Sequence, residues 1–270
     1  MKKDKKLIDL IPLELHGHRK KTTFFLNTIK DYLRDNKLND NEISILEIGC
    51  SNGSLVTLPL ADQGYNILGI DLHKPSIDVA NKNNTYSNAC FECKDLADFD
   101  TSETFNIIIL SDILEHVENP DFLLKMSKKH LIDNGIILVS VPNGYGPSEL
   151  ERRFLETTKI MNLINYFTWL IARLIGRKSV AYNSDSGHIQ FFKMKDLKNL
   201  YNASELEIKS FNKGALFGGG ITYPLGKILP FIIKPSLNLA DKINSNFCRD
   251  NNIDVLSAHG YYIDERDLKI

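Results

Sequence analysis

Between residues 43 and 141, short apolar runs alternate with stretches of helical periodicity. We expect the apolar runs to form strands at Ile43–Ile48, Asn66–Ile70, Ala89–Cys93, Phe105–Leu110 and Gly135–Val141. Helices are expected between them near residues 54–63, 75–83 and 119–131. Strands that alternate with helices form βαβ units with right-handed crossovers and parallel pairing. The sequence therefore predicts an α/β fold whose mostly parallel sheet carries helices on both faces.

The segments on either side of this alternation are more helical. Residues 19–36 carry apolar positions at helical spacing and predict a helix before the first strand. Further elements are expected after Val141: a long helical insertion at 147–178, a helix at 193–201, and strands near 206–212 and 256–263. The simplest division is one domain over residues 1–270, made of an N-terminal cap helix (1–40), a cofactor-binding core (41–145), substrate-side insertions (146–240) and a C-terminal strand (241–270).

Charge and composition indicate an ordinary globular protein. Lys and Arg total 33 against 34 for Asp and Glu, so no basic excess points to nucleic acid as a partner. Apolar residues make up 43% of the chain, which is enough for a sizeable core. No nucleic acid is therefore expected as a partner.

The sequence favours a cytoplasmic location. The basic start lacks the apolar stretch and small-residue cleavage site of a signal peptide, and no run of about eighteen apolar residues predicts a spanning helix. The four cysteines do not resemble a disulfide framework in a chain of this length. Cys90 and Cys93 form a single C-x-x-C, and a zinc site would need a second pair.

The first predicted strand runs into a glycine-containing turn, Gly49-Cys50-Ser51-Asn52-Gly53, and Asp71 follows at the end of the next strand. Glycine permits the sharp turn and the close approach of backbone to a ligand, and an acid at Asp71 can accept hydrogen bonds from ribose hydroxyls. Two ligand classes fit: a dinucleotide and S-adenosylmethionine. Ser51 and Ser54 occupy the second and third glycine places of the dinucleotide pattern, which favours the cofactor without a pyrophosphate.

These blocks resemble the motifs of class I S-adenosylmethionine-dependent methyltransferases. Leu46–Gly53 resembles the first motif, Phe91–Leu96 the segment that reaches adenine, Phe105–Val117 the fourth strand and its loop, and Ser140–Asn143 the end of the fifth strand. The departure from the family pattern is Ser51 at the middle glycine. The resemblance implies a Rossmann-like, seven-stranded sheet with the last strand antiparallel and a helical insert after strand five. It also implies a set of cofactor-binding residues: Glu47, Gly49, Ser51, Gly53, Asp71, Leu72, Asp95, Leu96 and Ser111.

A narrower resemblance comes from D-x-L-E-H-V-x-x-P at Asp112–Pro120, followed later by Gly187-His188-x-x-Phe191-Phe192. This combination is similar to small-molecule methyltransferases of the type 11 and type 23 groups, including the ubiquinone-biosynthesis O-methyltransferases. It implies methyl transfer to a small molecule and favours oxygen as the nucleophile. Oxidoreductases dependent on NAD and non-catalytic S-adenosylmethionine-binding proteins remain the alternatives.

The expected chemistry is an in-line displacement that needs close positioning and removal of a proton from the nucleophile. Catalytic candidates lie in the loop after the fourth strand: Asp112, Glu115 and His116. His116 could act as a general base or could hold the loop through a backbone hydrogen bond. Relatives of this pattern also imply a third option, in which Asp112, Glu115, His116 and His188 bind Mg²⁺ or another divalent metal.

Residues 159–178 and 216–233 are unusually apolar, and basic residues flank the first of them. The helix expected at 159–178 could pack on the domain, cover the substrate, form a dimer contact or lie on a membrane surface. Because of these segments, a bulky or lipid-linked acceptor and a peripheral contact with a membrane both remain open. The sequence leaves the oligomeric state, the acceptor and the need for a metal undecided.

Overall fold

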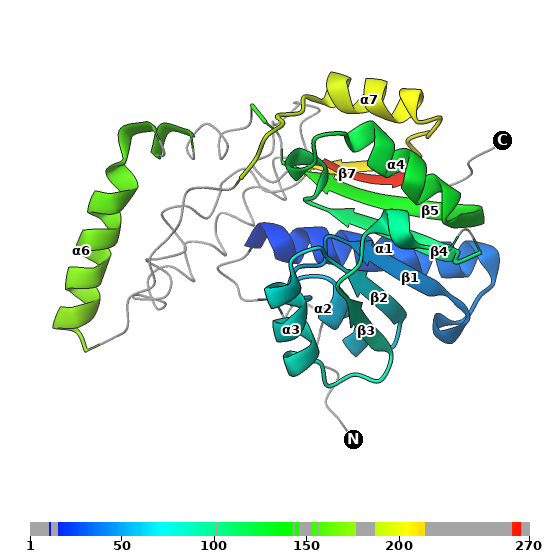
Figure 1. The fold of residues 1–270 in the computed structure, drawn as a ribbon, viewed down its shortest axis with the longest axis horizontal. Helices are drawn as coiled ribbons and strands as arrows, with labels where there is room; N and C mark the ends of the chain where they lie inside the picture. The colour runs from blue at the N-terminus through cyan, green and yellow to red at the C-terminus, as the bar shows by residue number, and fades with distance from the viewer. Residues whose placement is uncertain are drawn as a thin grey trace, which may run out of the picture.

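The structure is a computed structural model that describes residues 11, 16–100, 102–142, 144–145, 153–155, 157–176, 187–213 and 261–265. Its centre is one sheet of seven strands in the order β3-β2-β1-β4-β5-β7-β6 (Figure 1). The strands are β1 (Ser44–Ile48), β2 (Asn66–Ile70), β3 (Ala89–Glu92), β4 (Phe105–Ser111), β5 (Leu131–Val141), β6 (Ser210–Lys213) and β7 (Tyr261–Glu265). The helices are α1 (His16–Asn36), α2 (Thr57–Asp62), α3 (Lys74–Asn83), α4 (Pro120–Lys129), α6 (Ile160–Leu174) and α7 (Met194–Ala203). Short 3₁₀ turns in the described residues are η3 (Asp40–Glu42), η4 (Leu96–Asp98) and η5 (Leu114–His116).

Strand pairing confirms the predicted fold class. Strands β1 to β5 pair in parallel, whereas β7 runs antiparallel to both β5 and β6. The strand order reverses beside β1, since β2 lies on one side of it and β4 on the other. In parallel α/β sheets, ligands bind outside the carboxyl ends of the strands at such a reversal. The topology therefore places the candidate site above β1 and β4.

Both faces of β4, in the middle of the sheet, are buried, which explains its run of apolar residues. On β4, Ile107 and Ile109 join one core with α1, α2 and α3, while Ile108 and Leu110 join a second core with α4 and α7. Successive side chains of a strand point to opposite faces, so a strand covered on both sides needs apolar residues at every position. Helices on both faces were expected from the sequence, and Figure 1 shows this arrangement.

The predicted helical stretch at 147–178 is divided in the structure. Residues 153–155 are helical, and α6 begins only at Ile160, after Lys159 has adopted a left-handed conformation with φ of 54°. Such a conformation cannot continue a right-handed helix. Gly176, with φ of 67°, follows the other end of α6. In Figure 1, α6 stands away from the sheet and from the helices that cover it.

The C-terminal predictions are tested only in part. The strand expected at 206–212 overlaps β6 only at 210–212, because residues 206–209 are not in a strand, and the one expected at 256–263 overlaps β7 at 261–263. The apolar stretch at 216–233 lies outside the described residues, as does Asn143. Among the residues that the structure describes, no helix has both the length and the apolar character required to cross a bilayer.

Candidate cofactor and active site

The turn after β1 folds tightly against the end of β2. The backbone N–H groups of Gly49 and Cys50 both donate to the carbonyl of Ile70, at 2.9 and 3.0 Å. Gly49 and Gly53 have φ of 75° and 70°, a region that glycine enters without steric cost. A Cβ at Gly53 would lie 2.4 Å from the Phe91 ring, so both the backbone conformation and the packing require glycine there. The turn thus brings its backbone to the edge where a ligand would bind.

Asp71 holds this turn through its carboxylate. One carboxylate oxygen accepts from the backbone N–H of Ser51 at 2.8 Å, and the other accepts from that of His73 at 2.8 Å. Each carboxylate oxygen can accept about two hydrogen bonds, so both keep capacity for a ligand. Ser51 itself has φ of 50°, a conformation uncommon for residues other than glycine. Asp71 therefore connects the unusual turn to the start of α3.

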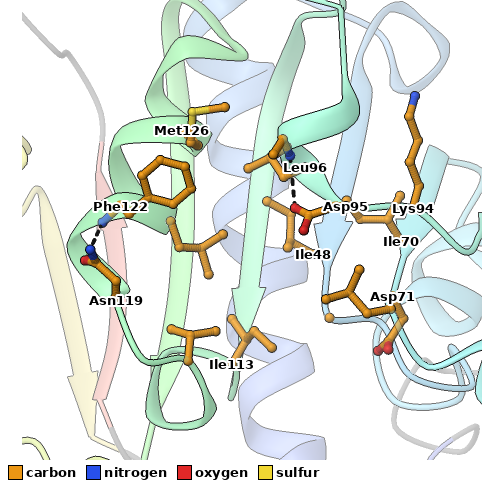
Figure 2. A pocket seen from close by; sticks show the side chains of 15 residues that line it. Ile48, Ile70, Asp71, Lys94, Asp95, Leu96, Ile113, Asn119, Phe122 and Met126 are labelled. Carbon is orange, nitrogen blue, oxygen red and sulfur yellow. Dashed lines mark hydrogen bonds between the residues drawn. The ribbon is translucent and has the colours of Figure 1, made fainter.

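A cavity of about 310 Å³ opens beside this turn, at the carboxyl ends of β1, β2, β3 and β4 (Figure 2). Its volume lies within the range of about 300–1,000 Å³ that is typical of small-molecule sites. The lining residues are Ile48, Gly49, Ile70, Asp71, Leu72, Lys94, Asp95, Leu96, Ala97, Ile113, Val117, Asn119, Phe122, Leu123 and Met126. The walls are largely apolar, and the two carboxylates of Asp71 and Asp95 lie at one side. Such a cavity suits a flat apolar ring carrying a polar edge and an attached sugar.

Asp95 begins the 3₁₀ turn η4 and is fixed by it. Its side chain accepts a hydrogen bond from the backbone N–H of Ala97 at 3.0 Å, as an N-cap residue does. On the opposite wall, the Asn119 side chain accepts from the backbone N–H of Phe122 at 3.0 Å and caps α4. Both walls of the cavity are thus held by helix caps.

Glu47 lies behind the turn and is 3% exposed. Its carboxyl accepts a short hydrogen bond from the hydroxyl of Thr57, the first residue of α2. Burial raises the pKa of Glu47 to about 8, although the bond from Thr57 and the charge of Lys21 act in the opposite direction. In the absence of a ligand, Glu47 is therefore mostly protonated at neutral pH.

Asp112 follows β4 and pairs with a lysine from the first helix. Its carboxylate forms an ion pair with the buried Lys21 ammonium and accepts from the Ser140 hydroxyl at 2.7 Å. Burial would raise the pKa of Asp112, but Lys21, His18 and the two hydrogen bonds outweigh that effect and hold the pKa at about 2. Asp112 also has φ of 54°, so the chain turns sharply as it leaves the strand. Asp112 is thus a fixed carboxylate at the carboxyl edge of the sheet.

A second cluster forms where η5 meets the segment around His188. One ligand atom each from Glu115, His116 and His188 lies within 4.8 Å of the other two. The carboxyl of Glu115, a residue 1% exposed, lies 4.0 Å from His116 Nε2 and 3.9 Å from His188 Nε2. The two imidazole rings meet edge to face, with centroids 4.9 Å apart.

Backbone hydrogen bonds hold this cluster together. The Glu115 carbonyl accepts from the N–H groups of Ile189 and Gln190, at 2.9 and 3.1 Å. The Gln190 side chain donates to the Val117 carbonyl at 2.6 Å. Ile113 and Val117, on either side of η5, also line the cavity. The cluster therefore lies directly beside the candidate cofactor cavity.

The contacts of His116 determine which of its nitrogens can accept a proton. Its Nδ1 lies 3.2 Å from the Gly187 carbonyl oxygen, which can only accept a hydrogen bond. Nδ1 therefore carries the hydrogen, and in the neutral ring the lone pair is on Nε2, on the side of Glu115. Burial lowers the pKa of His116 below its ordinary value, and His188 lowers it further, while the Gly187 carbonyl opposes them.

The model of a methyltransferase domain matches residues 18–210, about seven-tenths of the chain. The chain belongs to this methyltransferase family. Membership confirms the predicted class I S-adenosylmethionine-dependent methyltransferase, and with it S-adenosylmethionine as the expected cofactor.

Relatives of this methyltransferase include enzymes named ubiquinone biosynthesis O-methyltransferase. The one from Rickettsia typhi is 32% identical over 114 residues, which cover 40% of this chain and 45% of the relative. The one from Pelagibacter ubique is 32% identical over 120 residues, which cover 43% of this chain and 50% of the relative. The chain thus aligns with about half the length of these relatives.

Two solved structures resemble the methyltransferase over most of its length. A magnesium protoporphyrin IX methyltransferase from Synechocystis, solved with bound SAH, has a TM-score of 0.53 at 14% identity and covers 98% of this chain and 90% of its own. An S-adenosylmethionine-dependent methyltransferase from Methanosarcina mazei has a TM-score of 0.51 at 18% identity, and the match covers 87% of this chain and 96% of the chain from Methanosarcina. At these identities the likeness shows the fold alone.

The structure brings together many, but not all, of the residues predicted to bind the cofactor. Gly49, Asp71, Leu72, Asp95 and Leu96 line the cavity. The remaining four, Glu47, Ser51, Gly53 and Ser111, are not among its lining residues. Ser51 and Gly53 belong to the turn, and Glu47 lies behind it. The apolar wall formed by Phe122, Leu123 and Met126 was missed, because these residues have the spacing of any helix face that packs on a sheet.

The predicted set of four metal ligands is only partly assembled. Glu115, His116 and His188 gather, whereas the Asp112 carboxylate pairs with Lys21 and Ser140. Lys21 was also missed by the sequence analysis. A signal existed, because Lys21 shares the apolar face of α1 with Phe25 at i+4 and Ile29 at i+8, and a lysine on a buried face needs a partner.

Proposed function

We propose that this methyltransferase transfers the methyl group of S-adenosylmethionine to an oxygen atom of a small-molecule acceptor. The observation that carries the proposal is the position of the Glu115, His116 and His188 cluster beside an apolar cavity that presents two carboxylates. The cavity supplies a place for the adenosyl group, and the cluster supplies proton-accepting side chains next to it. The relatives named O-methyltransferase support oxygen as the nucleophile.

The cofactor would bind through the cavity walls and the turn. Asp71 would accept hydrogen bonds from the ribose hydroxyls, and Asp95 would accept one from the adenine amino group. The adenine ring would lie between Leu96 and the side chains of α4 that face it, which exclude water. The backbone at Gly49 and Gly53 would pass close to the remainder of the cofactor. These contacts orient the methyl group and reduce the entropy cost of reaching the reactive geometry.

His116 would act as the general base. Its lowered pKa keeps the ring neutral at neutral pH, and the contact with Gly187 leaves the lone pair on Nε2. When Nε2 takes the acceptor proton, the nearby Glu115 carboxyl, if ionised, would stabilise the resulting imidazolium. Glu115 would thus orient and stabilise the base, and Asp112 would fix the end of β4 through its pair with Lys21.

A divalent metal fits the same cluster as a second option. One carboxyl and two imidazoles form a donor set that suits transition metals better than Mg²⁺. Glu115, His116 and His188 would hold the ion, and the Gly187 carbonyl would orient His116 from behind. When bound, such an ion lowers the pKa of a coordinated hydroxyl. The base and metal options both use His116 Nε2, so only one of them can apply at a time.

Calorimetric titration of the full chain with S-adenosylmethionine and, separately, with NAD tests the cofactor proposal. We expect saturable heat with S-adenosylmethionine and none with NAD. Production of S-adenosylhomocysteine from a simple catechol, compared with the same catechol fully O-methylated, then tests the oxygen nucleophile. Heat with NAD alone, or equal turnover with both catechols, would contradict the proposal.

A further inference from the structure

Helix α6 exposes a continuous apolar face. Five of its large apolar residues repeat at intervals of three or four positions and therefore share one side of the helix. They are Ile160, Leu163, Phe167, Ile171 and Leu174, and their exposed fractions are 38%, 55%, 52%, 36% and 77%. Tyr166 and Trp169 add exposed aromatic surface, at 55% and 45%. Contiguous apolar surface of this kind marks an interaction site on a folded protein.

A narrow strip of α6 outside this face is buried. Thr168 and Ala172 are one turn apart and are only 3% and 1% exposed. Since the buried pair lies about 100° or more around the helix from the middle of the apolar face, the five apolar residues are not the part of α6 that is covered. Figure 1 shows the helix standing away from the sheet. The apolar face is therefore directed outward rather than into a core.

The charged residues within α6 and nearest to it in the sequence are positive, and the first acids on either side are Glu156 and Asp185. Residues 157–184 contain four basic residues and no Asp or Glu, in a chain whose net charge is −1. Lys159 precedes the helix, Arg173 lies in its last turn with its guanidinium 5.4 Å from the Trp169 ring, and Arg177 and Lys178 follow it in the sequence. Apolar and aromatic side chains bordered mainly by cations are complementary to a surface of apolar chains and anionic headgroups.

This charge pattern distinguishes a membrane from a second copy of the chain. Two α6 helices laid face to face, in either direction, would bring only like charges together, which opposes pairing. A spanning orientation does not fit either, because α6 has 15 residues and a bilayer needs about 20. A helix of this length can instead lie in the plane of the headgroups, with its apolar face inserted.

We propose that α6 docks this protein on the surface of membranes that contain anionic lipids. The apolar face inserts below the headgroups, while Lys159 and Arg173 contact lipid phosphates. The docking does not depend on the reaction proposed above. If that reaction holds as well, the docked enzyme meets acceptors that are themselves dissolved in the membrane.

Co-sedimentation with vesicles provides a direct test. Trp169, the single tryptophan of the sequence, adds a reporter on α6 from outside the five-residue face, since it lies about 160° around the helix from Phe167. The full chain is titrated with vesicles of phosphatidylglycerol and phosphatidylcholine in equal amounts, and with vesicles of phosphatidylcholine alone. We expect a blue shift of the tryptophan emission and co-sedimentation with the anionic vesicles, both weakened by high salt. The double variant Leu163→Gln/Phe167→Gln should bind these vesicles roughly tenfold less tightly, because it removes apolar contact at the centre of the face.

The matched control is Val79→Gln, which changes an apolar residue of α3 that is 44% exposed. It should bind vesicles as the unmodified chain does. Titration with S-adenosylmethionine shows whether each variant is folded, and it separates a failure of docking from a failure of the cofactor proposal. Absence of co-sedimentation with the anionic vesicles overturns the proposal. A blue shift that appears without vesicles and grows with protein concentration overturns it in favour of a second copy.

Discussion

Lys21 and Asp112 form an ion pair that joins the first helix to the end of β4, across 91 positions of sequence. The Lys21 side chain is 4% exposed and that of Asp112 is 29% exposed. Ser140, at the end of β5, donates to the same carboxylate. Thr22, the next residue of α1, donates to the Leu55 carbonyl at 2.8 Å beyond the glycine turn. Helix α1 is therefore attached to the candidate site at two points, and the site depends on it.

Removing the Lys21 charge should loosen this attachment. Lys21→Met keeps the aliphatic stem but leaves Asp112 without its cation, so we expect the free energy of unfolding to fall by about 2–3 kcal/mol at neutral pH. The control is Lys30→Met, which changes an exposed lysine on the same helix and should have little effect. Urea unfolding measures both. Because the pKa of Asp112 is lowered to about 2, its stabilising effect is present above its unfolded pKa and is lost as the pH falls toward 2. A loss of stability in Lys21→Met that persists unchanged in that acidic range would contradict this assignment.

Glu47 should make the protein less stable as the pH rises. Its pKa is raised to about 8 in the folded state, so the proton that it keeps on folding stabilises the protein at acidic pH. This contribution is complete below the unfolded pKa, declines as the pH increases, and is lost above about pH 8. Glu47→Gln mimics the protonated form and should match the unmodified protein near pH 4, then exceed its stability increasingly up to about pH 8. Glu92→Gln, on the exposed side of β3, is the control. If the curves of stability against pH for Glu47→Gln and the unmodified protein ran parallel, the pKa of Glu47 would be the same in the folded and unfolded states.

The Asp71 carboxylate should account for much of the cofactor affinity. Asp71→Asn keeps the shape but removes the charge, and we expect binding of S-adenosylmethionine to weaken by about 1–3 kcal/mol through lost charge-assisted hydrogen bonds. Calorimetric titration measures the change. Asp78→Asn, which changes an exposed acid on α3 paired with Lys74, should leave the affinity unaltered. Equal affinities in the two variants would mean that Asp71 does not contact the cofactor.

Comparing Gly53 with Gly176 separates two reasons for a glycine: its backbone conformation and the space around it. Gly53 and Gly176 have nearly the same φ, 70° and 67°, but a Cβ would meet the Phe91 ring only at Gly53 and nothing within 4 Å at Gly176. Gly176→Ala should cost about 1–2 kcal/mol through backbone strain alone. Gly53→Ala should cost about 1–3 kcal/mol more, because the ring must move. Thermal unfolding compares the two, and an equal loss of stability would show that Phe91 moves aside freely.

The sequence alone predicts contacts between residues that are close in the chain better than contacts between residues that are far apart. The turn at Gly49 and the acid at Asp71 belong to one βαβ unit, so a local pattern contained both. The pairing of Lys21 with Asp112 and the contact of His116 with Gly187 join residues 91 and 71 positions apart. No periodicity encodes such contacts, because they depend on how α1 and the segment near His188 pack on the finished sheet. The same limit applies to α6, whose apolar pattern was evident although its outward orientation was not.

Replacing His116 should affect turnover more than cofactor affinity. His116→Gln removes the proposed base, and we expect methyl transfer to slow by about 10²–10⁴-fold while S-adenosylmethionine still binds. In the unmodified enzyme, the lowered pKa of His116 predicts that activity falls only at pH values below the ordinary histidine pKa of about 6.5. His73→Gln, at an exposed histidine before α3, is the control. If the fall of activity at acidic pH were unchanged in His116→Gln, the titration would belong to another group.

The metal option makes a different prediction for His188. If a cation occupies the cluster, both imidazoles must be neutral ligands, so the full chain should bind Mn²⁺ or Zn²⁺ and release protons at mildly acidic pH. His188→Gln should then weaken metal binding as strongly as His116→Gln, and chelation should abolish turnover. If His116 is instead a base without a metal, His188→Gln should chiefly shift the pH profile, because the edge-to-face contact and the charge of the second ring are lost. Titration calorimetry with the metal alone, compared across the two variants, measures metal binding, and turnover after chelation measures whether the reaction needs the metal. Full turnover after chelation would rule out the metal option. Loss of turnover on chelation, together with tight metal binding that either substitution abolishes, would rule out the metal-free base.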